Sequence, residues 1–343
     1  MEHAYGTAID VSSDRLGTNL EGVTDVSAHE FFHLWNVKRI RPQSLEPIDY
    51  QREQDTRALW FSEGVTSTVA DILMVRAGLV TDRQYLDGLG RGITELQQRP
   101  AHVWQSVEDS SLDAWFEGNA FYRSPQRSVS YYDKGELLGI LLDLRIRKLT
   151  NGSKSLRDLF QWMNEHYAKQ HRYFPDSYGV QEAAETITGK SFDEFFRDYV
   201  SGVKPIPYDE FFEFVGLHVM TRTTEVAWPG FRATANLGGQ LEVVEVDPDS
   251  DAEKAGIANG DRVVALNGEP ANGAFEDDIA KTHPGDTVTM TLANRRGERT
   301  VKLRLASRAE QSYEVQDISS ATSEQRSHRT AWIHGDNEGG GGP

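Results

Sequence analysis

The chain has 343 residues, of which 38% are hydrophobic and 26% charged, and its formal net charge is -17. This length exceeds one ordinary domain, so two domains are expected, and the composition is that of a soluble globular protein. The acidic balance argues against nucleic acid or an anionic membrane as the main partner, because both repel a negative surface. The absence of cysteine excludes disulfides, thiol nucleophiles and thiolate metal ligands. No apolar run approaches the roughly 20 residues of a membrane span.

Residues 1–215 have a mainly helical pattern and are expected to form one domain, which begins abruptly, as a fragment would. Apolar spacing and end signals predict helices over about 23–37, 57–77 and 134–148, and capping-box patterns start two more at Ser155 and Ser191. Residues 79–130 show no clear pattern. Their aromatic side chains, such as Trp104 and Trp115, are expected in the core.

Residues 216–308 read as a small β-rich domain with its linker, so the whole chain is assigned to the α+β multidomain class. Short alternating runs between turn pairs predict strands at 241–246, 262–266, 288–292 and 301–305. A partly open β-barrel of about 80 residues fits this pattern. Residues 309–343 are polar and end in four glycines and a proline, so a flexible tail is expected.

The pentapeptide His29-Glu30-Phe31-Phe32-His33 carries the strongest chemical signal in the chain. Residues four apart on a helix lie nearly above one another, so both imidazoles can reach one metal ion. The intervening glutamate then lies beside the water on that metal. Zinc with three protein ligands keeps a position for water and lowers the pKa of that water to roughly 7. The pattern predicts one Zn²⁺ per chain and the chemistry of a hydrolase.

A third zinc ligand is expected from a second helix packed against the first. The best candidate is Glu63, in the segment WFSEG at 60–64; a solvated helix glutamate is the alternative. The interval after the second histidine is longer than in many zinc peptidases. Ser67, Asp71 and Asn36 are candidates to orient the imidazoles, by proximity in the sequence alone.

Three segments, in order, resemble one known family. The runs HEFFHLWNVKRIRP at 29–42, LWFSEGVTS at 59–67 and SYYDKGELLGILLDLRIR at 130–147 are similar to the glycyl aminopeptidase family of gluzincin metallopeptidases. The resemblance covers most of residues 1–308. It implies a mainly α-helical, thermolysin-like catalytic domain followed by a PDZ domain, with the family's N-terminal β domain missing here.

The resemblance also implies the roles of individual residues. The two histidines and Glu63 would hold zinc, and Glu30 would act as general base toward water and then as proton donor to the leaving amine. Tyr132 matches a tyrosine whose hydroxyl donates to the oxyanion, a hydrogen bond that strengthens as negative charge develops. Its neighbour Tyr131 is the rival, and a buried core tyrosine is the alternative.

Glu2 is the candidate for substrate binding. Met1-Glu2-His3 resembles the end of a Gly-Gly-Xaa-Glu-His motif whose carboxylate captures the free α-amine of the substrate. Such a carboxylate favours a charged N-terminus close to the scissile bond and leaves an internal peptide bond unpaired. Both glycines of the motif are absent from this chain.

The segment VVEVDPDSDAEKAGIANGDRVVALNGEP at 243–270 resembles a PDZ domain. PDZ domains take a peptide as an added strand and hold its terminal carboxylate with backbone amides. Leu237, Gly238 and Gly239 are the candidates for that carboxylate loop. A structural or intramolecular role for the domain is the alternative.

The resulting expectation is a zinc-dependent aminopeptidase whose preference for N-terminal glycine and alanine is implied by the family. Its partners would be peptide substrates and a peptide ligand of the PDZ domain. Two other classes stay open: a PDZ-assisted endopeptidase or processing protease, and a non-catalytic peptide-binding protein with a vestigial zinc site. The first residues show no signal-peptide pattern, so a cytoplasmic location is the expectation, although a leader could precede a fragment.

Overall fold

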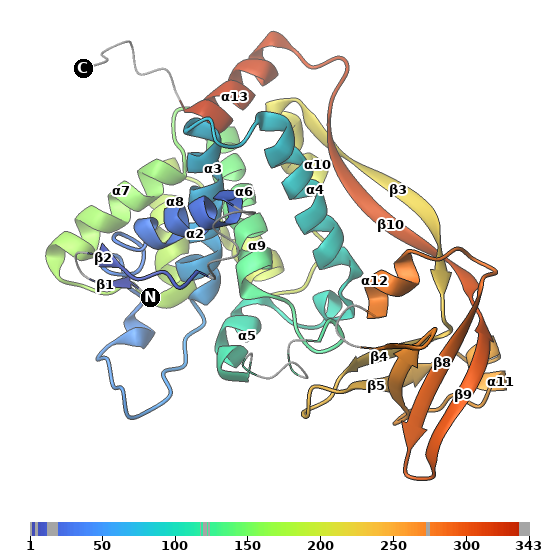
Figure 1. The fold of residues 1–343 in the computed structure, drawn as a ribbon. Helices are drawn as coiled ribbons and strands as arrows, with labels where there is room; N and C mark the ends of the chain where they lie inside the picture. Colours follow the sequence, from blue (N-terminus) through green and yellow to red (C-terminus); the bar gives the residue numbers. More distant parts are fainter. Residues whose placement is uncertain are drawn as a thin grey trace. The chain divides into compact units, whose positions relative to one another are not determined.

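The computed structural model describes residues 2–3, 6–11, 20–116, 118, 122, 124–271 and 275–335, without the side chains of residues 2, 3, 20 and 21. The chain divides into two compact units (Figure 1). Unit 1 contains residues 1–115, 128–220 and 313–343, and unit 2 contains residues 116–127 and 221–312. A mainly helical region is thus followed by a β-rich region, as the sequence predicted.

Unit 1 is built mainly from helices. Its elements in chain order are β1 (Glu2–His3), β2 (Gly6–Thr7), α2 (Leu20–Phe32), η1 (Gln43–Leu45), the π-helical turn η2 (Trp60–Gly64), α3 (Val65–Arg76), α4 (Asp82–Gln98), η3 (Pro100–Val103), α5 (Val107–Leu112), η4 (Asp113–Phe116), α6 (Tyr131–Leu149), α7 (Leu156–His166), η5 (Ala168–Gln170), α8 (Asp176–Thr188), α9 (Asp193–Phe195), η6 (Phe196–Val200), α10 (Tyr208–Phe212), η7 (Glu213–Val215) and α13 (Ser323–His334).

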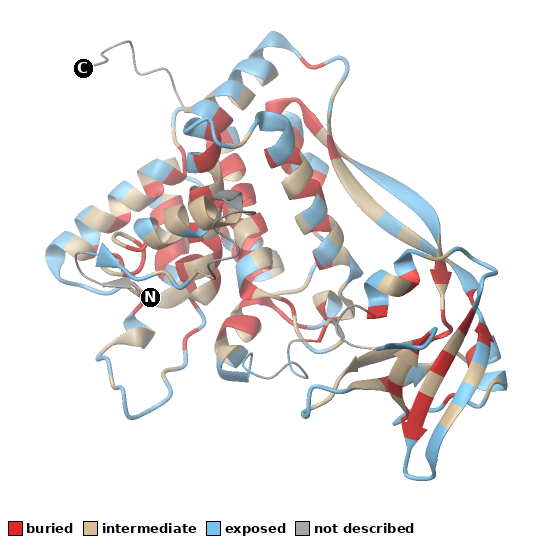
Figure 2. Ribbon diagram, viewed as in Figure 1, coloured by how far each residue is buried: buried red, intermediate tan, exposed pale blue. Residues whose placement is uncertain are grey.

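Helix α6 is the central helix of unit 1. Ser130 caps its N-terminus by accepting a hydrogen bond from the N–H of Asp133. Leu138, Leu141 and Leu142 in its middle are fully buried, and buried residues gather on the inner helices of the unit (Figure 2). Because apolar residues lie on all sides of α6, other elements must surround it, and η2, α3, α4, α5 and α10 contact it.

Among the described residues, no helix has the length and apolar character needed to cross a bilayer.

The backbone of α6 approaches η2 so closely that only glycine fits at the contact. A Cβ atom at Gly64 would lie 2.5 Å from the Cα of Gly135, and one at Gly135 would lie 2.5 Å from the carbonyl oxygen of Trp60. A larger residue at either position would push the two elements apart. The contact therefore sets the spacing between α6, which carries Tyr132, and the turn that carries Glu63.

The helices predicted around the first two motifs are present, but their winding differs from a regular α-helix. α2 ends at Phe32, and residues 33–39 continue as turns whose N–H groups bond to carbonyls three to five residues back. In the second helix, residues 60–64 form a π-helical turn, in which the N–H of Val65 bonds to the carbonyl of Trp60. Single π-helical turns are frequent at functional sites.

The sequence predicted a flexible tail over 309–343, but residues 309–335, the part of this range that the structure describes, contain a strand and a helix. β10 (Ala306–Asp317) pairs with β3 (Leu217–Trp228), and α13 follows. Trp332 and Ile333 of α13 are fully buried in the core of unit 1, and Arg76 Nε donates to the carbonyl oxygen of Ile333 at 3.0 Å. The helix is otherwise polar, so its two apolar anchors were too few to show a periodic pattern.

Unit 2 contains an antiparallel sheet with strand order β4-β5-β6-β8-β9, and β7 pairs with β6. Its elements are β4 (Phe231–Ala235), β5 (Leu241–Val246), α11 (Asp251–Lys254), β6 (Arg262–Leu266), β7 (Glu269–Pro270), α12 (Phe275–Ala280), β8 (Thr287–Asn294) and β9 (Gly297–Arg304). All four predicted strands overlap strands of this sheet. Asn267 and Gly268 have φ values of 52° and 89°, which suit the tight turn between β6 and β7.

Candidate metal centre

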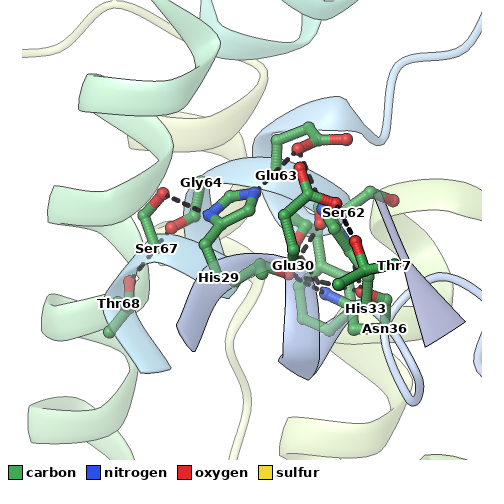
Figure 3. Close-up of polar contacts among 12 residues, drawn as sticks. Thr7, His29, Glu30, His33, Asn36, Ser62, Glu63, Gly64, Ser67 and Thr68 are labelled. Atoms are coloured by element: carbon green, nitrogen blue, oxygen red, sulfur yellow. Dashed lines mark hydrogen bonds and ion pairs between the residues drawn. The ribbon is translucent and has the colours of Figure 1, made fainter. Parts of the chain in front are cut away.

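The two histidines of the pentapeptide lie close together at the C-terminal end of α2 (Figure 3). The N–H of His33 bonds to the carbonyl oxygen of His29 at 3.3 Å, so the spacing of one helical turn is kept. Their ring centroids lie 4.7 Å apart with an interplanar angle of 85°. His33 is buried, at 3% exposure, and His29 is partly buried.

The π-helical turn η2 brings Glu63 to both rings. Its Oε2 atom lies 3.2 Å from Nε2 of His29 and 3.3 Å from Nε2 of His33. Burial alone would raise the pKa of Glu63, but hydrogen bonds and charge from the two histidines outweigh it and lower this pKa to about 2. The carboxylate is therefore ionised at neutral pH, as a metal ligand must be.

The other nitrogen of each imidazole has a protein partner. His33 Nδ1 donates to the backbone carbonyl of Asn36 at 2.6 Å; because a carbonyl only accepts, the proton lies on Nδ1 and the lone pair of Nε2 is available in the neutral ring. His29 Nδ1 and the Ser67 hydroxyl are hydrogen-bonded at 3.1 Å. Such contacts orient metal-binding histidines. Asp71, the third candidate, instead hydrogen-bonds with Asp25 and Glu136.

The donor set fits a catalytic zinc ion. Ligand atoms of His29, His33 and Glu63 all lie within 4.8 Å of one another, which is close enough for one ion to reach all three. Two imidazole nitrogens and one carboxylate oxygen form a known catalytic zinc ligand set, with a further position for water. Glu63 keeps 20% exposure, so solvent can reach the site.

Glu30 lies beside this cluster and contacts the N-terminal hairpin. The Thr7 hydroxyl on β2 donates to Oε2 of Glu30 at 3.3 Å (Figure 3). In the ladder between β1 and β2, Glu2 is the register partner of Thr7. The backbone of Glu2 is therefore opposite the residue that touches Glu30, while the side chain of Glu2 lies outside the described residues.

Tyr132 and Tyr131 differ in their access to the cluster. The Tyr132 ring lies 6.1 Å from the His29 ring between centroids and is 38% exposed, whereas Tyr131 is buried at 8% exposure. Burial raises the pKa of Tyr132, and the charge of Glu63 raises it further. Tyr132 therefore keeps its proton at neutral pH and can donate a hydrogen bond.

The loop predicted to bind a peptide carboxylate in unit 2 forms a tight turn, and its role in binding stays a prediction. Leu237, Gly238 and Gly239 lie in the turn between β4 and β5. The N–H groups of Gly238 and Gln240 donate to Oδ1 of Asn236 at 2.9 and 3.0 Å, and the N–H of Gly239 donates to the Asn236 carbonyl. These three amides are bonded within the turn.

A cavity of unit 2 lies between β4 and α12. Ala233 and Thr234 of β4, Val263 of β6, and Phe275 and Glu276 of α12 are among its lining residues. In the sheet order, β4 is the strand at one end. An edge strand beside an apolar cavity is the arrangement that accepts an added peptide strand.

Comparison with known proteins agrees with both units. Residues 22–138 match the family model for the M61 glycyl aminopeptidases, and residues 242–294 match the model for the PDZ domain. The first range contains the histidine pair, Glu63 and Tyr132. No curated protein matches the chain.

Solved structures with the same fold include an aminopeptidase N family protein from Idiomarina loihiensis, with a TM-score of 0.71 and 24% identity. The match covers 96% of this chain and 56% of that protein, so the chain spans little more than half of its length. The match to a serine endoprotease from Yersinia pestis covers 24% of this chain and 30% of that protein, with 26% identity and a TM-score of 0.22. The match to a PDZ domain protein from Parabacteroides distasonis covers 25% of this chain and 21% of that protein, with 20% identity and a TM-score of 0.22. The family models thus match a domain of a peptidase family over residues 22–138 and a PDZ domain over residues 242–294.

Proposed function

We propose that this chain is a zinc-dependent aminopeptidase that removes small N-terminal residues from peptides. The observation that carries the proposal is the convergence of Nε2 of His29, Nε2 of His33 and a carboxylate oxygen of Glu63, with Glu30 beside them. The match to the glycyl aminopeptidase family supports the preference for glycine and alanine. When bound, zinc supplies a Lewis acid and makes water acidic enough to ionise near neutral pH.

Glu30 and Tyr132 are the proposed catalytic residues. Glu30 removes a proton from the attacking water and passes it to the amine that leaves, which makes it base and then acid in one turnover. Tyr132 donates its hydroxyl proton in a hydrogen bond to the carbonyl oxygen of the substrate as negative charge develops there. Its protonated state and its ring position, 6.1 Å from the His29 ring between centroids, suit this role.

Glu2 is the proposed determinant of exopeptidase action. Its backbone lies opposite Thr7 in the β1–β2 ladder, and Thr7 contacts Glu30, so the hairpin runs beside the catalytic base. A carboxylate on this hairpin would pair with the free α-amine of a peptide and set the scissile bond one residue from the N-terminus.

The PDZ domain is proposed to bind a peptide in the cavity between β4 and α12. The edge of β4 that faces away from β5 would receive the peptide as an added strand, and the apolar lining from Val263 and Phe275 would receive its side chains. Peptide binding here would hold a substrate near the protein without taking part in the chemistry.

Metal analysis and two matched peptides test the proposed function. Protein purified without chelators should hold about one zinc per chain, and chelation should abolish hydrolysis of glycyl and alanyl amides. An N-acetylated peptide should resist cleavage, because its α-amine carries no charge for Glu2. Equal cleavage of acetylated and free peptides would favour the endopeptidase instead, and a chain without zinc would remove both enzyme assignments.

A further inference from the structure

We propose that Asn36 is a positioning residue that joins the two ligand-bearing segments of the metal centre. It contacts His33 through its backbone and the Glu63 turn through its side chain, so one buried residue holds both halves of the ligand set. The inference rests on the proposed zinc site and adds to it a residue that touches neither metal nor substrate.

On the histidine side, the carbonyl oxygen of Asn36 accepts the hydrogen bond of His33 Nδ1 at 2.6 Å. Asn36 lies in the irregular turns that follow α2, three residues after His33. A regular α-helix would direct this carbonyl along the helix axis toward a backbone N–H. The turn instead directs it at the imidazole, which sets the ring orientation and leaves Nε2 toward Glu63.

On the carboxylate side, the Asn36 amide donates to two groups that flank Glu63. Its Nδ2 atom lies 2.9 Å from the carbonyl oxygen of Phe61 and 3.2 Å from the hydroxyl of Thr66. Thr66 in turn donates to the carbonyl oxygen of Ser62 at 2.7 Å. The amide thus bonds to one residue before Glu63 and to one residue after it. A shift of the π-helical turn would move Glu63 relative to the histidines.

The hydrogen bonds of the Asn36 side chain are shielded from water. Asn36 and Thr66 are both fully buried, so water does not compete for their hydrogen bonds. The other amide atom of Asn36, Oδ1, has no hydrogen-bond partner among the described residues. The side chain therefore uses its donor end, and an apolar residue of similar size could fill the space while losing the grip on η2.

The substitution Asn36→Leu tests this role in the full chain. We expect it to weaken zinc binding by about 10–100-fold, the range found when groups that support metal ligands are removed. Affinity is measured by competition with a chromophoric chelator, and thermal unfolding of the metal-free protein reports whether the fold is kept. The visible spectrum of the Co²⁺-substituted variant should also change, because a displaced Glu63 alters the ligand geometry.

Ser62→Ala is the matched control. Ser62 is buried in the same π-helical turn, and its hydroxyl has no hydrogen-bond partner among the described residues, so its loss should leave zinc affinity unchanged. If Asn36→Leu does not fold, Thr66→Val removes one contact of the amide with little change in shape and should weaken zinc binding by less than Asn36→Leu is expected to.

The outcomes separate the two proposals. Wild-type zinc affinity and an unchanged Co²⁺ spectrum in Asn36→Leu, or in Thr66→Val where only that variant folds, would overturn the role of Asn36 and leave the zinc site in place. A wild-type chain that binds no zinc would overturn the proposed function itself. Weaker binding in Asn36→Leu with Ser62→Ala unchanged supports the positioning role.

Discussion

Units 1 and 2 each hold a carboxylate among nitrogen donors, and the two arrangements differ in their partners. In unit 2, Asp261 is 3% exposed and pairs with Arg299, and it also accepts from the Asn294 amide at 2.8 Å and from the N–H of Ala258 at 3.0 Å. In unit 1, Glu63 contacts two imidazoles and remains 20% exposed.

The comparison shows that a lowered carboxyl pKa does not by itself mark a functional site. The pKa is lowered for both residues, because their partners outweigh the effect of burial. Arg299 is a cation at every relevant pH and completes its contact with Asp261, so the pair needs nothing further. Imidazoles can be neutral and then offer lone pairs, so the group around Glu63 is open to a metal ion.

The largest expected effect is on kcat, and it tests Glu30 as the base at the candidate metal centre. Glu30→Gln should leave zinc bound and lower kcat by about 10²–10⁴-fold, because the amide cannot carry the proton from water to the leaving amine. Elemental analysis and steady-state hydrolysis of an alanyl amide measure the two quantities. Glu53→Gln, at an exposed glutamate, is the matched control. Unchanged activity in Glu30→Gln would reject Glu30 as the base.

The next experiment exchanges the two carboxylates for amides and tests the comparison directly. Glu63→Gln should weaken zinc binding by about 100-fold or more, because one of three ligands is lost, and should leave unit 2 unchanged. Asp261→Asn should leave zinc affinity unchanged and destabilise unit 2 by about 2 kcal/mol through its lost charged hydrogen bonds. Hydrogen exchange measures each unit separately. A loss of zinc in Asp261→Asn would break the comparison.

The parts of the site that lie close in sequence could be predicted, because helix geometry alone determines them. The spacing of His29 and His33 sets their rings together whatever surrounds α2. Glu63 comes from a different element, so the sequence identified it only as the best candidate, with a solvated helix glutamate as the alternative, and its π-helical turn was not predictable. The contacts of Asn36 depend on an irregular turn, and proximity in sequence identified the residue without showing what it does.

The missed elements share a physical cause, which is a long-range contact that the local pattern does not show. Helix α4 lies in the stretch 79–130, where the sequence showed no clear pattern. A Cβ atom at Gly90 of this helix would lie 2.7 Å from the carbonyl oxygen of Tyr313 on β10, so glycine is required there by packing. Trp104 and Trp115, expected in the core, are 54% and 56% exposed. The buried positions near them are taken by residues such as Val107 and Val129.

An intermediate effect is expected from Tyr132→Phe, which tests the proposed hydrogen bond from the Tyr132 hydroxyl to the oxyanion. The variant should lower kcat by about 10²-fold with little change in KM, because the lost hydrogen bond forms mainly in the transition state. Tyr131→Phe provides the comparison, since its hydroxyl belongs to a buried ring and should have a much smaller effect on turnover. Steady-state kinetics on a glycyl amide separates them. A larger loss in Tyr131→Phe would assign the oxyanion contact to the rival tyrosine.

The smallest effect is expected from lowering the pH, which tests the ion pair between Asp261 and Arg299. Burial would raise the pKa of Asp261, but hydrogen bonds from Arg299 and Asn294 lower it below its usual value. The pair therefore stabilises unit 2 fully above the unfolded-state pKa of about 3.9, and this contribution is lost as the pH falls through the lower folded-state pKa. The stability difference between wild type and Asp261→Asn, followed by hydrogen exchange of β8 amides, should be constant near neutral pH and should shrink below about pH 4. A difference that stays constant into strong acid would show that shape, and not the charge of Asp261, holds this part of unit 2.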